Sequence, residues 1–459
     1  MSTPTRPWLW VVLLVGLRSV PATAATAASP GDTLVVSLVE AERRALERSP
    51  LLAPARAGLE VSQAQKKQAR HSRYLPEFNV RNLWGPIPRQ RGQFTETGVL
   101  ISPDTALGLS DLRWFTQFDL NFVQPLYTFG KIASRIDAAE HQVEVSRADL
   151  AKTRDDVLLK VRQLYWGVVL GNELERVIRS VLDRVAEAEE KLQEQYDEGS
   201  ATQNDMFKFR LFKYQIGRRA REVTAQAEKA RSGLGAAIGL ALGEPFRVET
   251  TALETVDVTL DSLSAYVRMA LENRPELAQL RSGILARRSL VRASRGDARP
   301  TLFFAGTLSF NVAPSRFDPR NPYWNNRTNY FRPGVALGID WDLNFLQHRD
   351  KARVERVQAE KLEASVEPLR TQVEQEVKAA YLDVLRARDD VAEGRDALKA
   401  SQNWLRAELQ TFDLGLGDIA DVIDAFQANV TMEADHLQRI AAFNTAVAEL
   451  SRRVGRDIG

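Results

Sequence analysis

Two windows of the chain, 74–130 and 301–345, alternate apolar and polar residues. Alternation over several consecutive residues predicts β-strands with one apolar face and one polar face. We expect strands at 78–84, 112–127, 301–312 and 332–344. The apolar faces are rich in aromatic side chains, namely Trp84, Trp114, Phe118, Phe122, Phe304, Phe310 and Trp341. The opposite faces carry small or polar side chains, including Asp119, Asn121, Thr307 and Asp340.

Two long stretches between the strands have a helical pattern instead. Residues 131–242 contain no proline and 350–459 contain only Pro368, and their apolar positions recur in steps of four and three. Sustained heptads predict coiled coils, here long helices at 131–197 and 350–413 that return through helices at 203–240 and 418–454. At about 1.5 Å per residue, the first long helix would extend for about 100 Å.

Shorter helical patterns precede each pair of strands, at 34–73 and 260–297. Ser49–Pro50 and Arg274–Pro275 mark breaks in them, because proline starts helices and keeps the preceding residue extended. Each long helix could then pair with two shorter helices placed end to end. Pro368 should distort the second long helix locally.

The two halves of the chain are copies of one module. Residues 45–53 align with 270–278, and Tyr196-Asp197-Glu198-Gly199 aligns with Phe412-Asp413-Leu414-Gly415. We therefore expect two structural repeats, at 28–250 and 251–459. The fold class is mainly α with a β-barrel portion, in which each chain supplies a helical coiled coil and four strands.

The strands suit a transmembrane barrel with lipid outside and water inside. The two windows hold 20 of the chain's 36 aromatic residues and no lysine, which favours a membrane over the alternative, a soluble β-sandwich insertion. Four strands cannot close a barrel, and open strand edges are not viable in lipid, so strands of several chains must join. Two or three copies would supply eight or twelve strands.

Composition and charge exclude several other classes. The chain has 459 residues, 62 Lys and Arg against 60 Asp and Glu, and no cysteine. A net charge of +2 gives no electrostatic footprint for nucleic acid, and the lack of cysteine excludes disulfides and thiolate metal sites. No apolar run reaches the length of a membrane-spanning helix. The four histidines are scattered, and Gly233-Leu234-Gly235-Ala236-Ala237-Ile238-Gly239 follows a helix instead of a strand, so neither suggests an enzyme or a bound cofactor.

The N-terminus indicates export. Arg6 precedes an apolar run from Trp8 to Leu17, and a small-residue stretch from Ala22 to Ala28 offers Ala-x-Ala cleavage sites. This pattern predicts a cleaved signal peptide over residues 1–27. The alternatives are an uncleaved anchor or a disordered N-terminus.

The sequence resembles the TolC family of outer-membrane efflux proteins in three respects taken together. It has an export signal, and it repeats the order of helix, two strands, long helix and return helix. It also carries the motifs Tyr-Asp-Glu-Gly-x5-Asp and Phe-Asp-Leu-Gly-x5-Asp. The resemblance covers nearly the whole mature chain. It implies a homotrimer with a twelve-stranded barrel in outer-membrane lipid and a periplasmic helical tunnel. It also implies a periplasmic adaptor protein and an inner-membrane transporter as partners.

The same resemblance assigns roles to residues near the two helix turns. Gly199 and Ser200, with Gly415 and Leu416, match the tips that dock the adaptor; a glycine also permits the left-handed backbone that reverses a helix. Asp421 and Asp424 match inward-facing aspartate rings at the periplasmic gate, and Asp205 is their counterpart in the other turn. Ordinary helix N-terminal acids are the alternative for all three, above all for Asp205. Phe412 and Gly417 depart from the tyrosine and arginine that latch some members.

The sequence thus predicts a passive, non-enzymatic export channel of a Gram-negative outer membrane, without cofactor. No Gly-x4-Gly-Lys-Ser/Thr loop is present, so energy must come from a partner. The alternative is a structural or adhesive outer-membrane protein whose coiled coil spans the periplasm. The cargo, whether drug, metal ion, metabolite or polypeptide, is left open.

Overall fold

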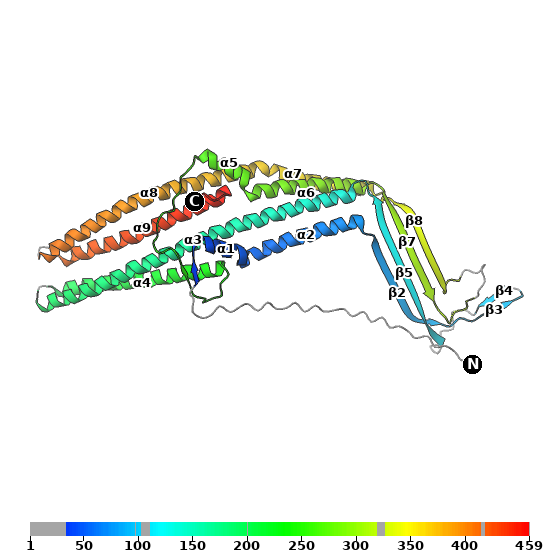
Figure 1. The fold of residues 1–459 in the computed structure, drawn as a ribbon, viewed down its shortest axis with the longest axis horizontal. Coiled ribbons are helices and arrows are strands. Elements are labelled where there is room, and N and C mark those ends of the chain that lie inside the picture. Colours follow the sequence, from blue (N-terminus) through cyan, green and yellow to red (C-terminus); the bar gives the residue numbers. More distant parts are fainter. Residues whose placement is uncertain are drawn as a thin grey trace.

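The computed structural model describes residues 34–96, 98–101, 111–199, 201–318, 326–414 and 418–458. Long helices lie side by side along one axis, and a four-stranded sheet continues from one end of them (Figure 1). The expected signal peptide at 1–27 lies outside the described residues.

Two helical hairpins form the end of the molecule opposite the sheet. In the first repeat, α3 (Lys131–Asp197) packs against α4 (Gln203–Ala237). In the second, α8 (Val366–Asp413) packs against α9 (Ile419–Val454). Because α3 is 67 residues long, it spans about 100 Å at about 1.5 Å per residue.

Shorter helices complete the rod on the side of the sheet. In the first repeat, α2 (Ala53–Tyr74) and α4 both contact α3 along its length. In the second, α6 (Pro275–Asp297) packs between α3 and α7 (Phe345–Ala364). The two repeats therefore meet mainly through α3 with α6 and α3 with α9.

The helix expected at 34–73 is wrong in its first residues. Leu34–Val36 forms a short strand, β1, which pairs in parallel with β6 (Phe246–Val248). The helix α1 (Leu38–Arg48) then begins behind the Ser37 cap, and a 3-10 turn over Pro50–Leu52 separates it from α2. Because this strand pairs with a segment about 210 residues away, the local periodicity of its own residues does not predict it.

The second repeat shows equivalent breaks. The expected 260–297 helix is two helices, α5 (Leu263–Asn273), capped by the Ser262 hydroxyl, and α6, which begins at Pro275. The expected 350–413 helix begins earlier, at Phe345, and is interrupted at Ser365, three residues before Pro368. Proline lacks the N–H for the bond to residue 364 and crowds its carbonyl, which accounts for the interruption.

The sheet consists of β2 (Glu77–Pro88), β5 (Leu112–Tyr127), β7 (Thr301–Val312) and β8 (Tyr330–Asp340), in that order and all antiparallel. The strand expected at 332–344 therefore ends early, and Trp341 lies just beyond it. Its indole N–H donates to the Ala298 carbonyl at 3.2 Å, and the Asp342 carboxylate accepts from the Asn344 N–H at 3.0 Å. These local bonds turn the chain away from the ladder.

A second hairpin was not expected. Between β2 and β5 in the chain, β3 (Gly92–Thr95) pairs with β4 (Gly98–Ile101). Gly98 has φ +144, a conformation that residues with a Cβ rarely adopt. The strand expected at 78–84 likewise extends to Pro88.

The main core lies midway along the rod, where α1, α3, α5, α8 and α9 meet the β1–β6 pair. Tyr165 and Tyr266 are the largest fully buried side chains there, and the Tyr165 hydroxyl lies 2.7 Å from the Thr250 hydroxyl. A smaller cluster near the helical tips joins Phe212 on α4 to Phe426 on α9. The core thus fixes the two hairpins relative to each other.

Candidate functional site

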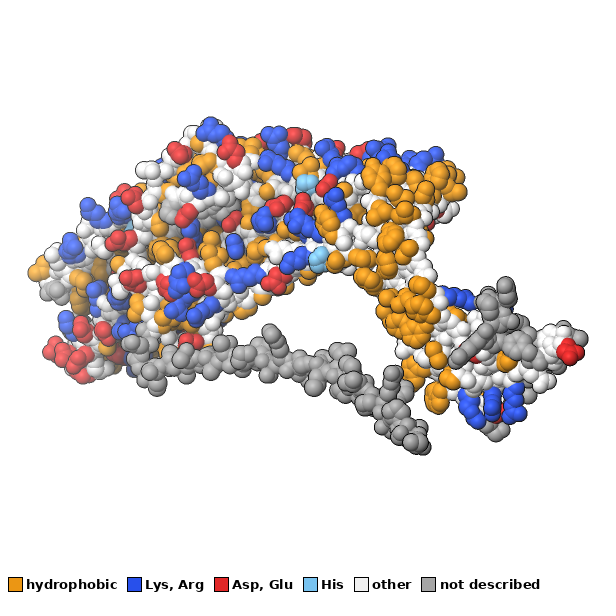
Figure 2. Space-filling model, turned by 45° about the vertical axis from the view of Figure 1, so that its right-hand side comes forward, with side chains coloured by type: hydrophobic (Ala, Val, Ile, Leu, Met, Phe, Trp, Pro, Cys, Tyr) orange, Lys and Arg blue, Asp and Glu red, His pale blue; other side chains and the backbone are white. Residues whose placement is uncertain are grey.

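The register of the sheet places its aromatic residues on one face. Direct partners in an antiparallel pair project to the same side. Phe118 pairs with Phe310, which pairs with Phe331, and the rings of Phe118 and Phe310 stack at 5.1 Å. This apolar face contains Phe78, Val80, Trp84, Trp114, Phe118, Leu120, Phe122, Phe304, Leu308, Phe310, Val335 and Leu337. Figure 2 shows hydrophobic side chains gathered over the sheet.

The polar residues lie together on the opposite face. Asn121 pairs with Thr307, and Asp340 pairs with Thr301. Asp119 accepts hydrogen bonds from the Ser309 hydroxyl and, at 2.9 Å, from the Gln117 amide. The four polar positions singled out in the sequence therefore share one face of one sheet.

The outer edges of the sheet have no partner strand among the described residues, because β2 and β8 end its order. On the apolar face, large hydrophobic side chains beside these edges are exposed. Trp84 on β2 is 72% exposed and Val335 on β8 is 75% exposed. An apolar sheet with two open edges is incomplete as a single chain.

The first helical tip reverses through Gly199. Its φ of +78 is the left-handed conformation that ends a helix, and its N–H donates to the Tyr196 carbonyl at 3.1 Å. The return helix then starts with a capping box: the Thr202 hydroxyl accepts from the Asp205 N–H, and the Asp205 carboxylate accepts from the Thr202 N–H at 3.0 Å. Ser200 lies outside the described residues.

Asp205 therefore has a local role that accounts for its position. The side-chain hydrogen bond from Thr202, followed by that residue's backbone N–H, holds the pKa of the Asp205 carboxyl below its usual value. A carboxylate with a lowered pKa stabilises the fold at neutral pH, and that contribution is lost as pH falls through the lowered pKa.

Replacing Thr202 with alanine tests the cap. We expect the start of α4 to lose about 1 kcal/mol of local stability at pH 7, because one orphan N–H loses its acceptor. Amide hydrogen exchange of residues 203–207 should accelerate about fivefold, and the difference from wild type should shrink in acid as Asp205 protonates. Thr411→Ala, whose hydroxyl donates to its own helix at the Ala407 carbonyl, is the control and should leave these amides unchanged. Equal exchange rates in Thr202→Ala and wild type would contradict the capping role.

Asp421 and Asp424 lie on the first turns of α9, and both are exposed. The N-cap is Asp418, whose carboxylate accepts from the Ala420 N–H at 2.8 Å. Asp421 and Asp424 are three residues apart and so share one side of the helix. Because Asp418 already caps α9, neither aspartate serves as its N-cap. Gly415, Leu416 and Gly417 lie outside the described residues, and Phe412 is half-buried.

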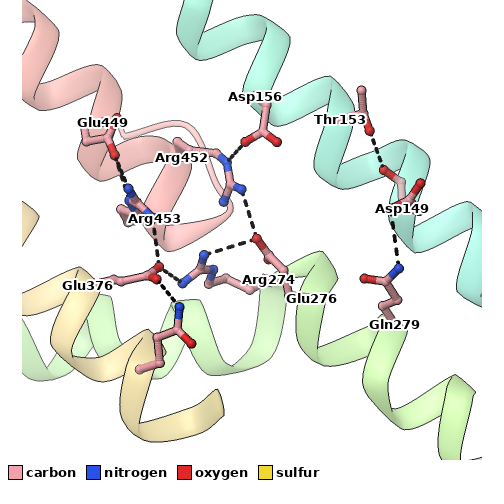
Figure 3. A network of polar contacts seen from close by, with 11 residues as sticks. Asp149, Thr153, Asp156, Arg274, Glu276, Gln279, Glu376, Glu449, Arg452 and Arg453 are labelled. Carbon is pink, nitrogen blue, oxygen red and sulfur yellow. Dashed lines mark hydrogen bonds and ion pairs between the residues drawn. The ribbon is translucent and has the colours of Figure 1, made fainter. Parts of the chain in front are cut away.

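A buried ionic network joins the two repeats in the middle of the rod (Figure 3). Arg274 is 4% exposed, and its guanidinium contacts Glu376 of α8 at 2.6 Å and Glu276 of α6 at 3.2 Å. Arg452 of α9 contacts Asp156 of α3 at 2.6 Å and Glu276 at 2.9 Å. The network thus links α3, α6, α8 and α9.

The charges in this network hold each other ionised. Burial by itself would raise the pKa of the Glu276 carboxyl, but its backbone hydrogen bond and the guanidiniums of Arg274 and Arg452 outweigh burial, so the pKa is lowered. Burial opposes the charge of Glu376 in the same way, and the hydrogen bond from Arg274 again leaves its pKa lowered. From the sequence, Arg274 was expected only to be an extended residue before a proline. An arginine and a glutamate on either side of Pro275 were the available signal.

The described residues contain no cluster of three or more His, Cys, Asp or Glu that could hold a metal ion. In that same part of the chain, every helix is too short or too polar to cross a membrane. An open groove of about 1120 Å³ lies between α3, α4 and the segment 240–251. Two of its arginines contact neighbouring protein atoms: Arg231 pairs with Glu228 at 2.8 Å, and Arg176 donates to the Thr251 carbonyl at 2.9 Å.

Comparisons with known proteins agree with this geometry. The sequence matches the family described as "Outer membrane efflux protein" over residues 42–240 and 266–456. It is 25% identical over 231 residues to the cobalt-zinc-cadmium resistance protein CzcC of Cupriavidus metallidurans, covering 49% of this chain and 53% of CzcC. It is 24% identical over 346 residues to the alkaline protease secretion protein AprF of Pseudomonas aeruginosa, covering 72% of this chain and 64% of AprF.

The fold is that of solved outer-membrane channels. The Campylobacter jejuni CmeC outer membrane channel matches with a TM-score of 0.73 at 14% identity, covering 91% of this chain and 85% of that one. At such low identity the match shows the fold alone. Long helices, a four-stranded antiparallel sheet and two repeats are therefore shared with that channel.

Proposed function

The chain belongs to the outer membrane efflux protein family, a family of non-enzymatic channels, and on that premise we propose that three copies form one continuous exit duct. The observation that carries this proposal is the open sheet, which has an apolar face and, within the described part of the chain, no partner strand at either edge. In lipid, every backbone polar group needs a partner, so β8 of one copy would pair with β2 of the next. Three copies close twelve strands, within the known range for such barrels.

The two faces of the sheet then acquire distinct surroundings. The apolar face, including Trp84, Trp114 and Phe304, would contact outer-membrane lipid. The polar face, with Asp119, Asn121, Thr307 and Asp340, would line water. The long helices would continue the barrel as a tunnel into the periplasm.

At the far end of the tunnel, three copies of Asp421 and Asp424 would form two acidic rings that restrict passage. Charged rings of this kind attract ions of opposite sign and narrow a pore. Both side chains are exposed in the single chain. Asp205 is engaged in the α4 cap, so we assign it no part in the gate.

The tips at Gly199 and Ser200, and at Gly415 and Leu416, would dock a periplasmic adaptor that connects the duct to an inner-membrane transporter. The transporter would supply the energy. We place the protein in the outer membrane of a Gram-negative cell after removal of the signal peptide. CzcC is named for metal resistance and AprF for protease secretion. Relatives with such different names favour a duct whose cargo is chosen by its partners.

Single-channel recording of the purified chain in a planar bilayer tests the duct. We expect the Asp421→Ala, Asp424→Ala double variant to conduct several-fold more than wild type at neutral pH. The reason is that each ring loses its three carboxylates, and with them the restriction on passage. Divalent cations should reduce the wild-type current more than that of the variant. Asp396→Ala, which removes an exposed carboxylate further up α8, should conduct like wild type.

Two results would overturn the proposal. A complete lack of conductance in both proteins would favour a structural or adhesive role for the coiled coil. Equal conductance in wild type and the double variant, at every pH and divalent concentration, would exclude the aspartate rings as the gate.

A further inference from the structure

One row across the polar face of the sheet concentrates charge. Arg81 pairs with Asp119, Asp119 with Ser309, and Ser309 with Arg332, so each of the four strands contributes one residue. Direct partners project to the same side, so the four side chains lie next to one another. We call this set the arginine row.

The rows on either side of the arginine row carry no formal charge. Towards the helices lie Asn79, Asn121, Thr307 and Gly334, and towards the far end lie Leu83, Gln117, Asn311 and Tyr330. The two arginines and one aspartate are therefore an isolated band of charge within the polar face. Its formal charge is one positive unit per chain.

The negative member of the row is already engaged. Asp119 accepts from the Ser309 hydroxyl and from the Gln117 amide at 2.9 Å, both neutral donors. Arg81, its direct partner in the ladder, is exposed and makes no ion pair or hydrogen bond within the described part of the chain. Its guanidinium is thus available to a ligand.

The second arginine is positioned by its own strand. Arg332 lies over the Tyr330 ring, 4.2 Å from its centroid, and donates to the Asn326 carbonyl at 3.4 Å. Stacking on an aromatic ring orders a guanidinium while keeping its charge. Figure 2 shows further basic side chains at the end of the molecule away from the helices.

We propose that the arginine row is an anion-binding belt in the lumen of the barrel, with polyvalent anions such as phosphorylated solutes as its ligands. The inference rests on the proposed function, because only a closed trimer turns the polar face into a lumen and brings six arginines around it. Guanidinium groups bind phosphate oxygens through paired, charge-assisted hydrogen bonds. Rings of arginine are also how pores select anions and phosphate.

Block of single-channel current by inositol hexakisphosphate tests the belt. The full-length chain is placed in a bilayer of neutral phosphatidylcholine, so no anionic headgroup competes, and the polyanion is added to each side in turn. We expect block from the barrel side at micromolar concentration, weakening as salt is raised. The Arg81→Gln, Arg332→Gln variant should need at least about tenfold more polyanion, since each lost charge-assisted contact costs about that factor.

Two further variants make the result specific. Arg89→Gln, Arg327→Gln removes the same charge from exposed positions outside the row and should be blocked like wild type. The Arg81→Lys, Arg332→Lys variant keeps both positive charges. It should therefore show most of the wild-type block that the Arg81→Gln, Arg332→Gln variant loses. Spermine added to the barrel side should not reproduce the block.

The outcomes separate the two proposals. A conducting wild type whose block is unchanged in Arg81→Gln, Arg332→Gln overturns the anion belt and leaves the duct intact. Equal loss of block in the Arg89→Gln, Arg327→Gln control would also overturn it, since the effect would then follow net charge alone. If neither the wild type nor the Asp421→Ala, Asp424→Ala variant conducts, the duct and the anion belt are both overturned.

Discussion

We expect the Arg274→Met variant to have a free energy of unfolding about 3 kcal/mol lower than wild type, because a buried ion-pair network loses one partner. Arg274 is 4% exposed and is the residue through which Glu376 of α8 and Glu276 of α6 are bridged. Methionine fills a similar volume but leaves two partly buried carboxylates with less compensating charge. Thermal loss of helical circular dichroism in detergent measures the change, as a lower midpoint.

The pH dependence of this loss follows from the pKa values of the two glutamates. Both carboxyls have pKa values below normal, so their ionised forms stabilise the fold at pH above the usual carboxyl range. That contribution disappears as pH falls through the lowered pKa values. The gap between Arg274→Met and wild type should therefore be full at pH 7 and narrow in acid.

Arg288→Met provides a matched control on α6, the helix that Arg274 directly precedes. Arg288 pairs with Glu363 of α7 at 2.8 Å, but both side chains are exposed. Exposed pairs contribute about 0–1 kcal/mol, so the midpoint should barely move. An Arg274→Met variant as stable as Arg288→Met would show that the buried network contributes specificity of packing and not stability.

The features predicted well from sequence are those with a local period. Alternation around Phe118 and Phe310 identified the strands and also the face that each residue occupies, because side chains on a strand alternate with period two. Heptads identified the long helices in the same way. Gly199 was predictable as a turn, since a left-handed residue at a helix end is usually glycine.

The features missed depend on residues far apart in the chain. The β1–β6 pair joins Leu34 to Phe246, and the ionic network joins Asp156 to Arg452. Neither segment reveals its partner through its own pattern. The arginine row could not be predicted for the same reason. Arg81 and Arg332 are far apart in the sequence, and only the register of the four strands places them in one row.

The two ends of the proposed duct would differ in charge. Asp421 and Asp424 place negative charge at the helical tips, whereas Arg81 and Arg332 place positive charge in the barrel. A cation would then enter more easily from the periplasmic end than from outside, because each mouth attracts the opposite sign.

The assignment of the two sheet faces leads to the prediction with the largest effect on assembly. Val335 and Ala336 are neighbours on β8, and both are exposed in the single chain. Val335 pairs with Gly306 on the apolar face, whereas Ala336 pairs with Ala305 on the polar face. The two positions are thus adjacent on one strand and both exposed, but their side chains project to opposite faces of the sheet.

We expect Val335→Lys to destabilise the barrel by about 2–4 kcal/mol per chain, because it places an ammonium group in the hydrocarbon of the bilayer. Since the proposed trimer would contain three copies, chemical cross-linking should no longer capture a trimer, and the protein should leave the outer-membrane fraction. Ala336→Lys should assemble normally, because its ammonium group would project into water. Equal assembly of both variants would contradict the lipid-facing assignment, and a defect confined to Ala336→Lys would reverse the two faces. That reversal would also move the arginine row from the lumen to the lipid, so this pair of variants decides the orientation on which the duct and the anion belt both depend.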